Sequence, residues 1–276
     1  MVKIALTGGD GMVGSRIIEL LQDKIQFIPI LQKHMDITDK NKVASVLNSI
    51  DFDIFLHLAA FTNVDAAENN KKTANGVNVL GTQNIFEIVT HKKKKMIYIS
   101  TGFVFDGNNP PYSEKSIPRP ISIYGETKYQ GEQLLNNEAM IIRFDYPYRN
   151  EFKLKKDFVR GIITALTEGK KLSMVTDSLI TPTFVDDIAF GLKYLIDHYS
   201  PEVFHLVGQN SVSPFEAGTS IAKIAKLDSS LISGISYEQY FKGRAKRPQF
   251  AHIISIKNKF IKMKSFEEGL QILYHN

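Results

Sequence analysis

Tyr124 and Lys128 stand four positions apart in a segment, residues 121–136, whose pattern predicts a helix after a proline-rich loop. Residues four apart share one face of a helix, so the phenol and the ammonium would be neighbours. A free tyrosine has a pKa of about 10, and an adjacent ammonium lowers that pKa by favouring the phenolate. The spacing therefore predicts a tuned proton donor. A tyrosine and a lysine so placed more often form a surface ring over an aliphatic stem, so the interpretation depends on the rest of the chain.

Thr101 would supply a second hydroxyl to the same site. It ends a β-branched and aromatic run, residues 97–101, which stops at a Ser-Thr-Gly turn. Such a run is typical of a buried parallel strand whose carboxyl end meets a crevice. Together with Tyr124, Thr101 could hold and protonate a carbonyl oxygen while a hydride arrives from elsewhere.

A glycine-rich turn near the amino terminus predicts the source of that hydride. Gly8, Gly11 and Gly14 follow an apolar run at residues 2–6, and apolar residues then recur at helical spacing. In a dinucleotide-binding fingerprint these glycines let the backbone approach a pyrophosphate at the start of a helix. Because the turn lies between a strand and a helix, the sequence predicts nucleotide binding here.

Strands and helices alternate along the first two thirds of the chain. This alternation predicts an α/β fold with a Rossmann-type, doubly wound parallel sheet. Residues 1–148 are expected to form the dinucleotide-binding domain, and residues 149–276 a smaller, discontinuous substrate-binding cap, with 184–207 returning to the sheet. The expected strands are 2–6, 27–31, 54–59, 96–99, 140–143 and 203–206, and the expected helices include 41–48, 75–90, 121–136, 157–169 and 188–198.

Composition restricts the partners and the chemistry. The 276 residues contain no cysteine, which excludes a thiol nucleophile or a disulfide framework. The net charge of +5 is spread along the chain, and the lysine block at 92–95 has no interleaved aromatic residues, so neither nucleic acid nor membrane is an expected partner. No signal peptide or membrane span is visible, and we expect a cytoplasmic protein. The histidines show no ligand spacing, and His57, inside an apolar strand, is expected to be a core residue.

Several motifs together resemble one known family. The matching stretches are residues 8–14, 36–39, 59–68, 77–78, 100–107 and 124–128, with looser matches at 177–183, 186–189, 204–208 and 247–249. This order of parts resembles the extended short-chain dehydrogenase/reductases, and within them the dTDP-4-dehydrorhamnose reductases. The resemblance implies reduction, by NADPH or alternatively NADH, of the C4 carbonyl of a nucleotide-activated 4-dehydro-6-deoxy sugar, in deoxysugar and cell-surface polysaccharide synthesis.

The resemblance also implies a role for each matching position. The catalytic residues would be Thr101, Tyr124 and Lys128. The cofactor would contact Gly8, Gly11, Met12, Val13, Gly14, Lys33, Asp36, Ile37, Ala59, Ala60, Thr62, Tyr124 and Lys128. Thr101, Gly102, Tyr146 and Arg247 would face the substrate, with Arg247 as the candidate for its diphosphate, although an arginine there is as often a surface ion pair. Asn78 would either order the backbone behind the site or act as a hydrogen-bonding residue at a helix start.

Three positions depart from the family pattern. Gly102 stands where these reductases usually carry an aspartate, and Tyr146 where they carry a tryptophan. Arg16 replaces a glutamate that helps to bind magnesium at a dimer contact. We therefore expect no metal site, and any homodimer would not use the family's magnesium site.

Two other functions are compatible with the same scaffold. One is different sugar-nucleotide chemistry, such as epimerisation or 4,6-dehydration. Dehydratases carry an acid pair after the threonine, where this chain has Gly102 and Phe103, and bifunctional epimerase-reductases use a cysteine that is absent here. The other is a non-catalytic, NADP-binding regulatory subunit like that of methionine adenosyltransferase, which the intact triad disfavours.

The end of the second strand predicts a preference for NADPH. An NAD-selective site places an acid there, which repels a 2′-phosphate, but this chain has Lys33 and His34 and no acid before Asp36. A partly exposed Lys33 contact would contribute on the order of 1 kcal/mol, or several-fold in affinity. We expect Lys33→Asp to lower the preference for NADPH, measured as a pair of dissociation constants at fixed ionic strength. Equal wild-type affinities and an unchanged ratio in the variant would contradict this role.

Overall fold

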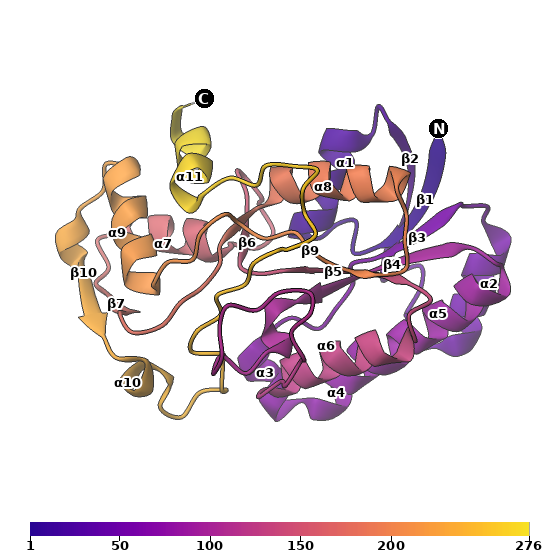
Figure 1. Cartoon of the computed structure of the whole chain (residues 1–276), viewed down its shortest axis with the longest axis horizontal. Coiled ribbons are helices and arrows are strands. Elements are labelled where there is room, and N and C mark those ends of the chain that lie inside the picture. The colour runs from indigo at the N-terminus through magenta and orange to yellow at the C-terminus, as the bar shows by residue number, and fades with distance from the viewer. Residues whose placement is uncertain (276) are drawn as a thin grey trace.

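A six-stranded parallel sheet forms the centre of one half of the molecule in the computed structural model, which describes residues 1–275 (Figure 1). From edge to edge its strands are β2 (Ile25–Ile30), β1 (Val2–Thr7), β3 (Ile54–His57), β4 (Lys95–Thr101), β5 (Met140–Phe144) and β9 (Val203–His205). The strand order reverses between β1 and β3. In an open parallel sheet, a ligand crevice forms at the carboxyl ends of the strands at such a reversal.

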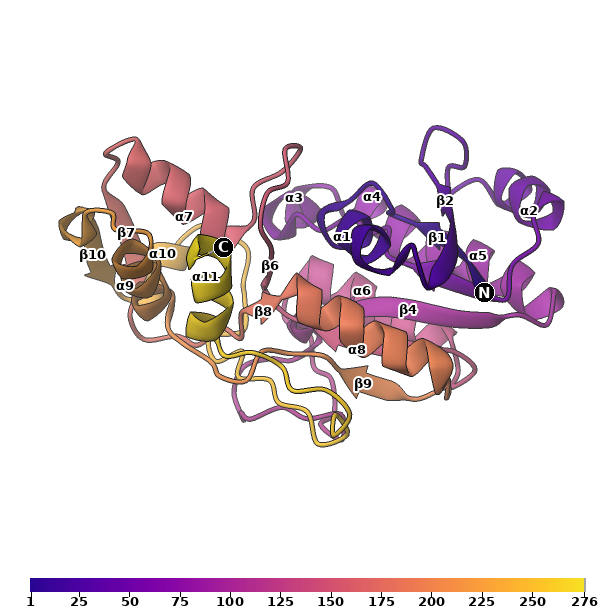
Figure 2. The same ribbon diagram turned by 90° about the horizontal axis from the view of Figure 1, so that it is seen from above.

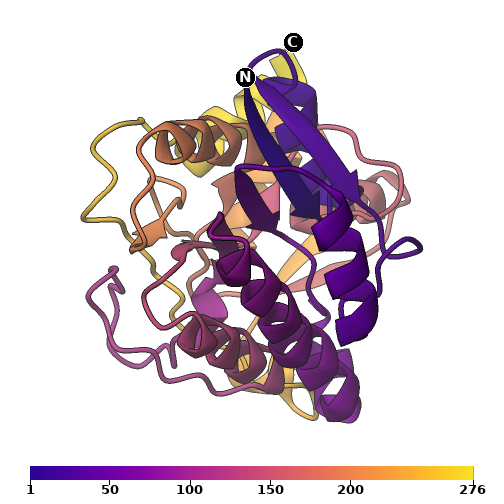
Figure 3. The ribbon, with the colours of Figure 1, turned by 90° about the vertical axis from the view of Figure 1, so that its right-hand side faces the viewer.

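Helices cover both faces of this sheet, so its central strands β3 and β5 are buried along their whole length. Figure 1 shows α1 (Met12–Leu21) and α8 (Val185–Asp197) above the sheet, with α5 (Gly81–His91) and α6 (Ile123–Leu134) below it. Figure 3 shows the same layers from the side. Each face has its own buried apolar core, one including α1 and α8 and the other α2 (Lys40–Ser49) and α5. The predicted fold class is confirmed.

The segment between β3 and α5 is more broken than the sequence pattern predicts. The predicted helix at 75–90 begins as a π-helix, η1 (Gly76–Leu80), and only then continues as α5. Two short helices, α3 (Val64–Asn69) and α4 (Lys71–Asn75), precede it. A single π-helical turn inside a longer helix often marks a functional site.

A smaller half with its own apolar core lies beyond the carboxyl ends of the strands (Figure 2). It contains α7 (Phe158–Thr167), β7 (Leu172–Val175), α9 (Pro214–Ile224), β10 (Ile232–Ile235), α10 (Tyr237–Phe241) and α11 (Phe266–His275). The paired strands β6 (Pro147–Tyr148) and β8 (Thr183–Phe184) connect it to the sheet half. Between its segments the chain returns to the sheet as α8 and β9. Within residues 1–275, no helix has both the length and the apolar character that crossing a membrane requires.

Helix α6 packs unusually close to the end of β4, and Gly125 makes this possible. A Cβ at position 125 would overlap the backbone oxygen of Phe103. We expect Gly125→Ala to lower the free energy of unfolding by about 1–3 kcal/mol through overpacking. The matched control is Gly161→Ala in α7, where a Cβ meets no atom within 4 Å.

The control is expected to raise stability by up to about 1 kcal/mol, since alanine is the better helix former. Denaturant unfolding of both variants tests the difference. Equal effects of the two substitutions would contradict the tight packing of α6.

Candidate active site

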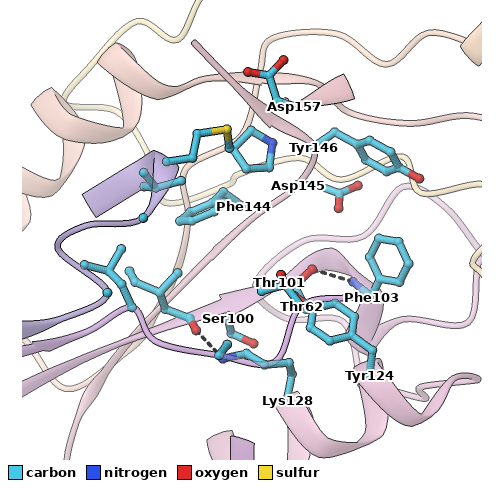
Figure 4. A pocket seen from close by; sticks show the side chains of 18 of the residues that line it. Thr62, Ser100, Thr101, Phe103, Tyr124, Lys128, Phe144, Asp145, Tyr146 and Asp157 are labelled. Carbon is cyan, nitrogen blue, oxygen red and sulfur yellow. Dashed lines mark hydrogen bonds between the residues drawn. The ribbon is translucent and has the colours of Figure 1, made fainter. Parts of the chain in front are cut away.

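A cleft of about 620 Å³ opens at the carboxyl ends of β1, β3, β4 and β5, between the two halves (Figure 4). It therefore lies at the reversal of strand order. Its lining includes most of the residues that the sequence analysis selected, namely Gly8, Gly11, Met12, Val13, Gly14, Ala59, Ala60, Thr62, Thr101, Tyr124, Lys128, Tyr146 and Arg247. One cleft thus brings together the predicted nucleotide turn and the predicted catalytic groups.

The glycine turn at the amino-terminal end of α1 fits a dinucleotide's phosphates. Gly8 has a φ of 70°, and a Cβ there would lie 2.9 Å from the backbone nitrogen of Ala59. A Cβ at Gly14 would overlap the Gly8 oxygen. The helix N-cap is Gly11, which offers no side-chain acceptor to the first N–H groups. These donors and the helix dipole are therefore available to an anion.

Three residues predicted to contact the adenine half lie outside the cleft lining. Lys33 is exposed in the turn after β2. The Asp36 carboxylate accepts hydrogen bonds from the Thr38 backbone nitrogen at 2.9 Å and hydroxyl at 2.8 Å, which lower its pKa. The Ile37 side chain packs in the core against Gly81, so only its backbone remains for a ligand. Their contacts with the cofactor stay predictions.

Thr101 and Tyr124 meet at the closed end of the cleft. The Thr101 hydroxyl caps the short helix η2 (Gly102–Val104) by accepting from the Phe103 nitrogen, and its contact with the Tyr124 hydroxyl lowers the pKa of Tyr124. Burial has the larger effect and raises that pKa to about 12. Tyr124 is therefore a neutral phenol at pH 7, with a proton to donate.

Lys128 is buried beside the pair. Its ammonium donates to the Ile99 carbonyl oxygen at 2.7 Å and lies 4.0 Å from the centre of the Tyr98 ring. Burial lowers the pKa of Lys128 to about 7, against an opposing effect of Glu132. The sequence analysis predicted that Lys128 brings the pKa of Tyr124 down toward working pH. That prediction is wrong for this structure, because burial of the phenol dominates and raises its pKa.

Asn78 connects two segments next to the site through hydrogen bonds. It is buried in the π-helix, where its amide oxygen accepts from the Phe61 nitrogen at 2.8 Å. Its amide nitrogen donates to the Phe61 oxygen at 3.2 Å and to the Thr127 hydroxyl at 3.0 Å. Asn78 thus joins the loop after β3 to α6, which favours the role of ordering the backbone over that of a helix-start residue.

Of the two predicted substrate contacts Tyr146 and Gly102, only Tyr146 lines the cleft. Tyr146 lines the cleft, with a φ of 39° and its ring centre 6.1 Å from that of Phe103. Such a left-handed backbone in a bulky residue is strained and concentrates at functional sites. Gly102 does not line the cleft, because Ile253 covers it and a Cβ there would overlap the Ile253 side chain. Gly102 thus lies outside the cleft lining, and its contact with the substrate stays a prediction.

Arg247 lines the cleft and is also engaged in an ion pair. Its guanidinium binds the Asp65 carboxylate at 2.7 Å and stacks 5.0 Å from the Phe241 ring centre. The ion pair that the sequence left open is therefore present, and the contact with the diphosphate stays a prediction. The pair lowers the pKa of Asp65, and it fixes Arg247 at the mouth of the cleft.

Several lining residues were not selected from the sequence. They are chiefly Phe103, Phe144, Asp145, Lys155, Lys156, Asp157 and Phe158. For Asp145 a signal existed, since it is an acidic residue directly after a predicted strand, as Thr101 is a hydroxyl after another. Phe103 and Phe144 lie at strand ends, Asp157 and Phe158 begin α7, and only Lys155 and Lys156 come from an irregular segment.

His57 and Arg16 are structural. The His57 ring is hydrogen-bonded to the hydroxyls of Thr7 at 2.7 Å and Thr82 at 3.2 Å. Burial lowers the pKa of His57 to about 3, and the expected role as a core residue is confirmed. Arg16 binds Asp186 through two contacts of 2.7 Å, joining α1 to α8. Among residues 1–275, no group of three or more acidic, histidine or cysteine side chains is arranged to hold a metal ion.

Comparison with known proteins agrees with this geometry. A family model described as "RmlD substrate binding domain" matches residues 2–276. The chain belongs to this family. A crystal structure of dTDP-4-dehydrorhamnose reductase from Bacillus anthracis, in complex with NADP, superposes with a TM-score of 0.91 at 32% identity, covering 99% of both chains.

Two further relatives of the family illustrate its range. A dTDP-4-dehydrorhamnose reductase of Aggregatibacter actinomycetemcomitans is 28% identical over 80% of this chain and 78% of its own. Methionine adenosyltransferase 2 subunit beta of Bos taurus is 27% identical over 85% of this chain and 75% of its own. The proteins to which this chain is similar therefore include both a reductase and a subunit of another enzyme.

The Arg16 ion pair predicts that activity needs no added divalent metal. A cation placed beside this guanidinium would be repelled, and Asp186 is already neutralised by it. We expect EDTA to change the reductase rate by less than about twofold, the scale of a surface electrostatic effect. A large loss of rate that magnesium restores would contradict this expectation.

Proposed function

We propose that this chain reduces the C4 carbonyl of a nucleotide-activated 4-dehydro-6-deoxy sugar, as a dTDP-4-dehydrorhamnose reductase does, with NADPH. The observation that carries the proposal is the group of Tyr124, Thr101 and Lys128 in the cleft that begins at the glycine turn, in which Thr101 and Lys128 are buried and Tyr124 is half-buried. When bound there, NADPH supplies a hydride to the carbonyl carbon. The sheet half would hold the cofactor, and the smaller half would cover the sugar.

The chain's own residues would bind and protonate the oxygen of that carbonyl. Tyr124 transfers its phenolic proton to this oxygen as the carbonyl becomes an alcohol, so one hydride and one proton are added across the C=O bond. Thr101 donates a hydrogen bond to the same oxygen. The Lys128 ammonium would hold the ribose and would stabilise the phenolate that proton transfer leaves on Tyr124. In this role the lysine acts after the transfer rather than by lowering the resting pKa of the phenol.

Basic residues at the mouth of the cleft would bind the sugar nucleotide's diphosphate. Arg247 is the main candidate, since its planar guanidinium binds phosphate oxygens in pairs. It would exchange part of its contact with Asp65 for the substrate. Tyr146 would lie along the sugar ring. We propose a cytoplasmic enzyme, and any homodimer would form through a surface other than the family's magnesium site.

The relative among methionine adenosyltransferase subunits supports a second candidate, a cofactor-binding regulatory partner. The buried proton donor disfavours it, because a binding partner has no need of a phenol, a hydroxyl and an ammonium buried together. Epimerisation and dehydration remain less supported, since no acid side chain directly follows Thr101. Copurification with a larger catalytic chain, together with no turnover of any sugar, would favour the regulatory function.

The proposal predicts a specific loss on removing the Tyr124 hydroxyl. Incubation with NADPH and a panel of nucleotide 4-dehydro sugars should show loss of nicotinamide absorbance and a 6-deoxy sugar product. We expect Tyr124→Phe to keep NADPH affinity within a small factor while lowering kcat by roughly two to four orders of magnitude, as for a lost general acid.

Lys128→Met provides the comparison, because we assign it both ribose binding and phenolate stabilisation. It should weaken cofactor binding and lower kcat together. Full activity of Tyr124→Phe would remove the mechanism. A Lys128→Met variant altered only in KM would remove the stabilising role of the ammonium.

A further inference from the structure

Asp145 is a buried carboxyl group that the proposed reaction does not yet use. It follows the last residue of β5, is 2% exposed and lines the cleft. Its Oδ2 atom has no hydrogen-bond partner among the described residues. A buried polar atom without a partner is costly, and native proteins keep few of them. This oxygen is occluded from solvent and keeps an unused hydrogen-bonding capacity, in a carboxyl group that lines the cleft.

The sheet register places Asp145 beside Gly102, the residue that follows Thr101. Strands β4 and β5 pair Thr101 with Phe144, so the next residues, Gly102 and Asp145, are neighbours. A Cβ at Gly102 would lie 3.2 Å from the Asp145 carboxyl carbon. The Ile253 side chain fills the space that a Cβ would need, and the carboxyl lies next to it. In Figure 4 the Asp145 side chain lies between Tyr146 and Thr101.

The surroundings of Asp145 suit an uncharged acid. Burial raises its pKa well above the ordinary value, although the backbone N–H groups of Tyr146 and Thr181 oppose this. The phenols of Tyr124 and Tyr146 are close enough for a charge on Asp145 to raise their pKa values. An uncharged carboxyl has one donor and free acceptor sites, so it can bond a hydroxyl in both directions without repelling a developing alkoxide.

The position of the carboxyl identifies the part of the substrate that it would meet. This step rests on the proposed function, in which Thr101 and Tyr124 hold the C4 oxygen. The carboxyl lies one residue beyond the pair formed by Thr101 and Phe144, so in the proposed reaction it would face a ring carbon next to C4. In a 4-dehydro-6-deoxy sugar, C5 carries a methyl group and C3 carries a hydroxyl. The C3 hydroxyl is therefore the polar group within reach.

We propose that Asp145 is a substrate-binding residue that hydrogen-bonds the C3 hydroxyl and selects sugars that carry it. A site that binds a hydroxyl through a buried polar group discriminates strongly against an analogue without that hydroxyl, since the protein group then stays unpaired.

The test compares two substrates across matched variants. They are a dTDP-4-dehydro-6-deoxyhexose and its 3-deoxy analogue, and the measured quantity is the ratio of their kcat/KM values with NADPH. We expect wild type to favour the hydroxyl-bearing sugar by about 10- to 100-fold. Asp145→Ala should bring the ratio to within about threefold of one, whereas Asp145→Asn, which keeps a donor and an acceptor, should hold it within about threefold of wild type.

Ser100→Ala is the matched control, because the Ser100 hydroxyl is the other buried, unpartnered oxygen among the described residues that line the cleft. Its ratio should stay at the wild-type value. NADPH affinity reports whether each variant is folded, and Asp145→Leu, which fills the space, replaces Asp145→Ala if that variant is insoluble.

Three results would overturn the assignment. They are a wild-type ratio near one, an equal loss of the ratio in Asp145→Asn and Asp145→Ala, and an equal loss in Ser100→Ala. If wild type reduces no sugar of this class, the proposed function fails separately. In that case the role of Asp145 is tested by binding alone. Calorimetry in the presence of NADP⁺ gives the dissociation constants of two dTDP-6-deoxyhexoses, one with and one without the 3-hydroxyl, and their ratio decides the role.

Discussion

The close packing of α6 against the end of β4 is the contact on which the site depends. Gly125 lets the helix start against the Phe103 backbone, and Gly131 lets it continue against Tyr98 and the π-helix. Larger side chains would hold the helix away from the sheet. Because of this approach, the phenol and the ammonium are buried at the strand ends rather than exposed on a helix surface. The same burial makes the phenol a weak acid and the amine a weak base.

The sheet half of the fold was predictable because its signals are local and strong. Apolar runs of strand length, a glycine turn between a strand and a helix, and a proline-rich loop each mark one element. The cleft positions of Gly8 and Thr101 were predictable for the same reason, since they follow strand ends directly, whereas Tyr124 and Lys128 were selected by their helical spacing. These predictions needed only the order of elements along the chain and the rule that parallel strands end at one edge of the sheet.

What the sequence did not predict depends on contacts between distant segments. The π-helix at Asn78 is stabilised by bonds to Phe61 and Thr127, which no local pattern reveals. Gly102 matches a substrate-facing position, yet Ile253, far along the chain, covers it. Helical spacing correctly placed Tyr124 beside Lys128 on one face. It could not show that both are buried, and burial reverses the direction of the pKa shift on the phenol.

The smaller half is built from segments that leave the sheet and return to it. The chain enters it after β5, goes back through β8 into α8 and β9, and enters it again before α9. Residues 260, 261 and 263 pack on the sheet core shortly before α11 begins. The two halves are therefore not modular. If relatives exchanged their substrate-binding halves by a single crossover, segments that share one core would be separated. A change of substrate specificity in this fold would therefore require several simultaneous exchanges, or substitutions within the cleft itself.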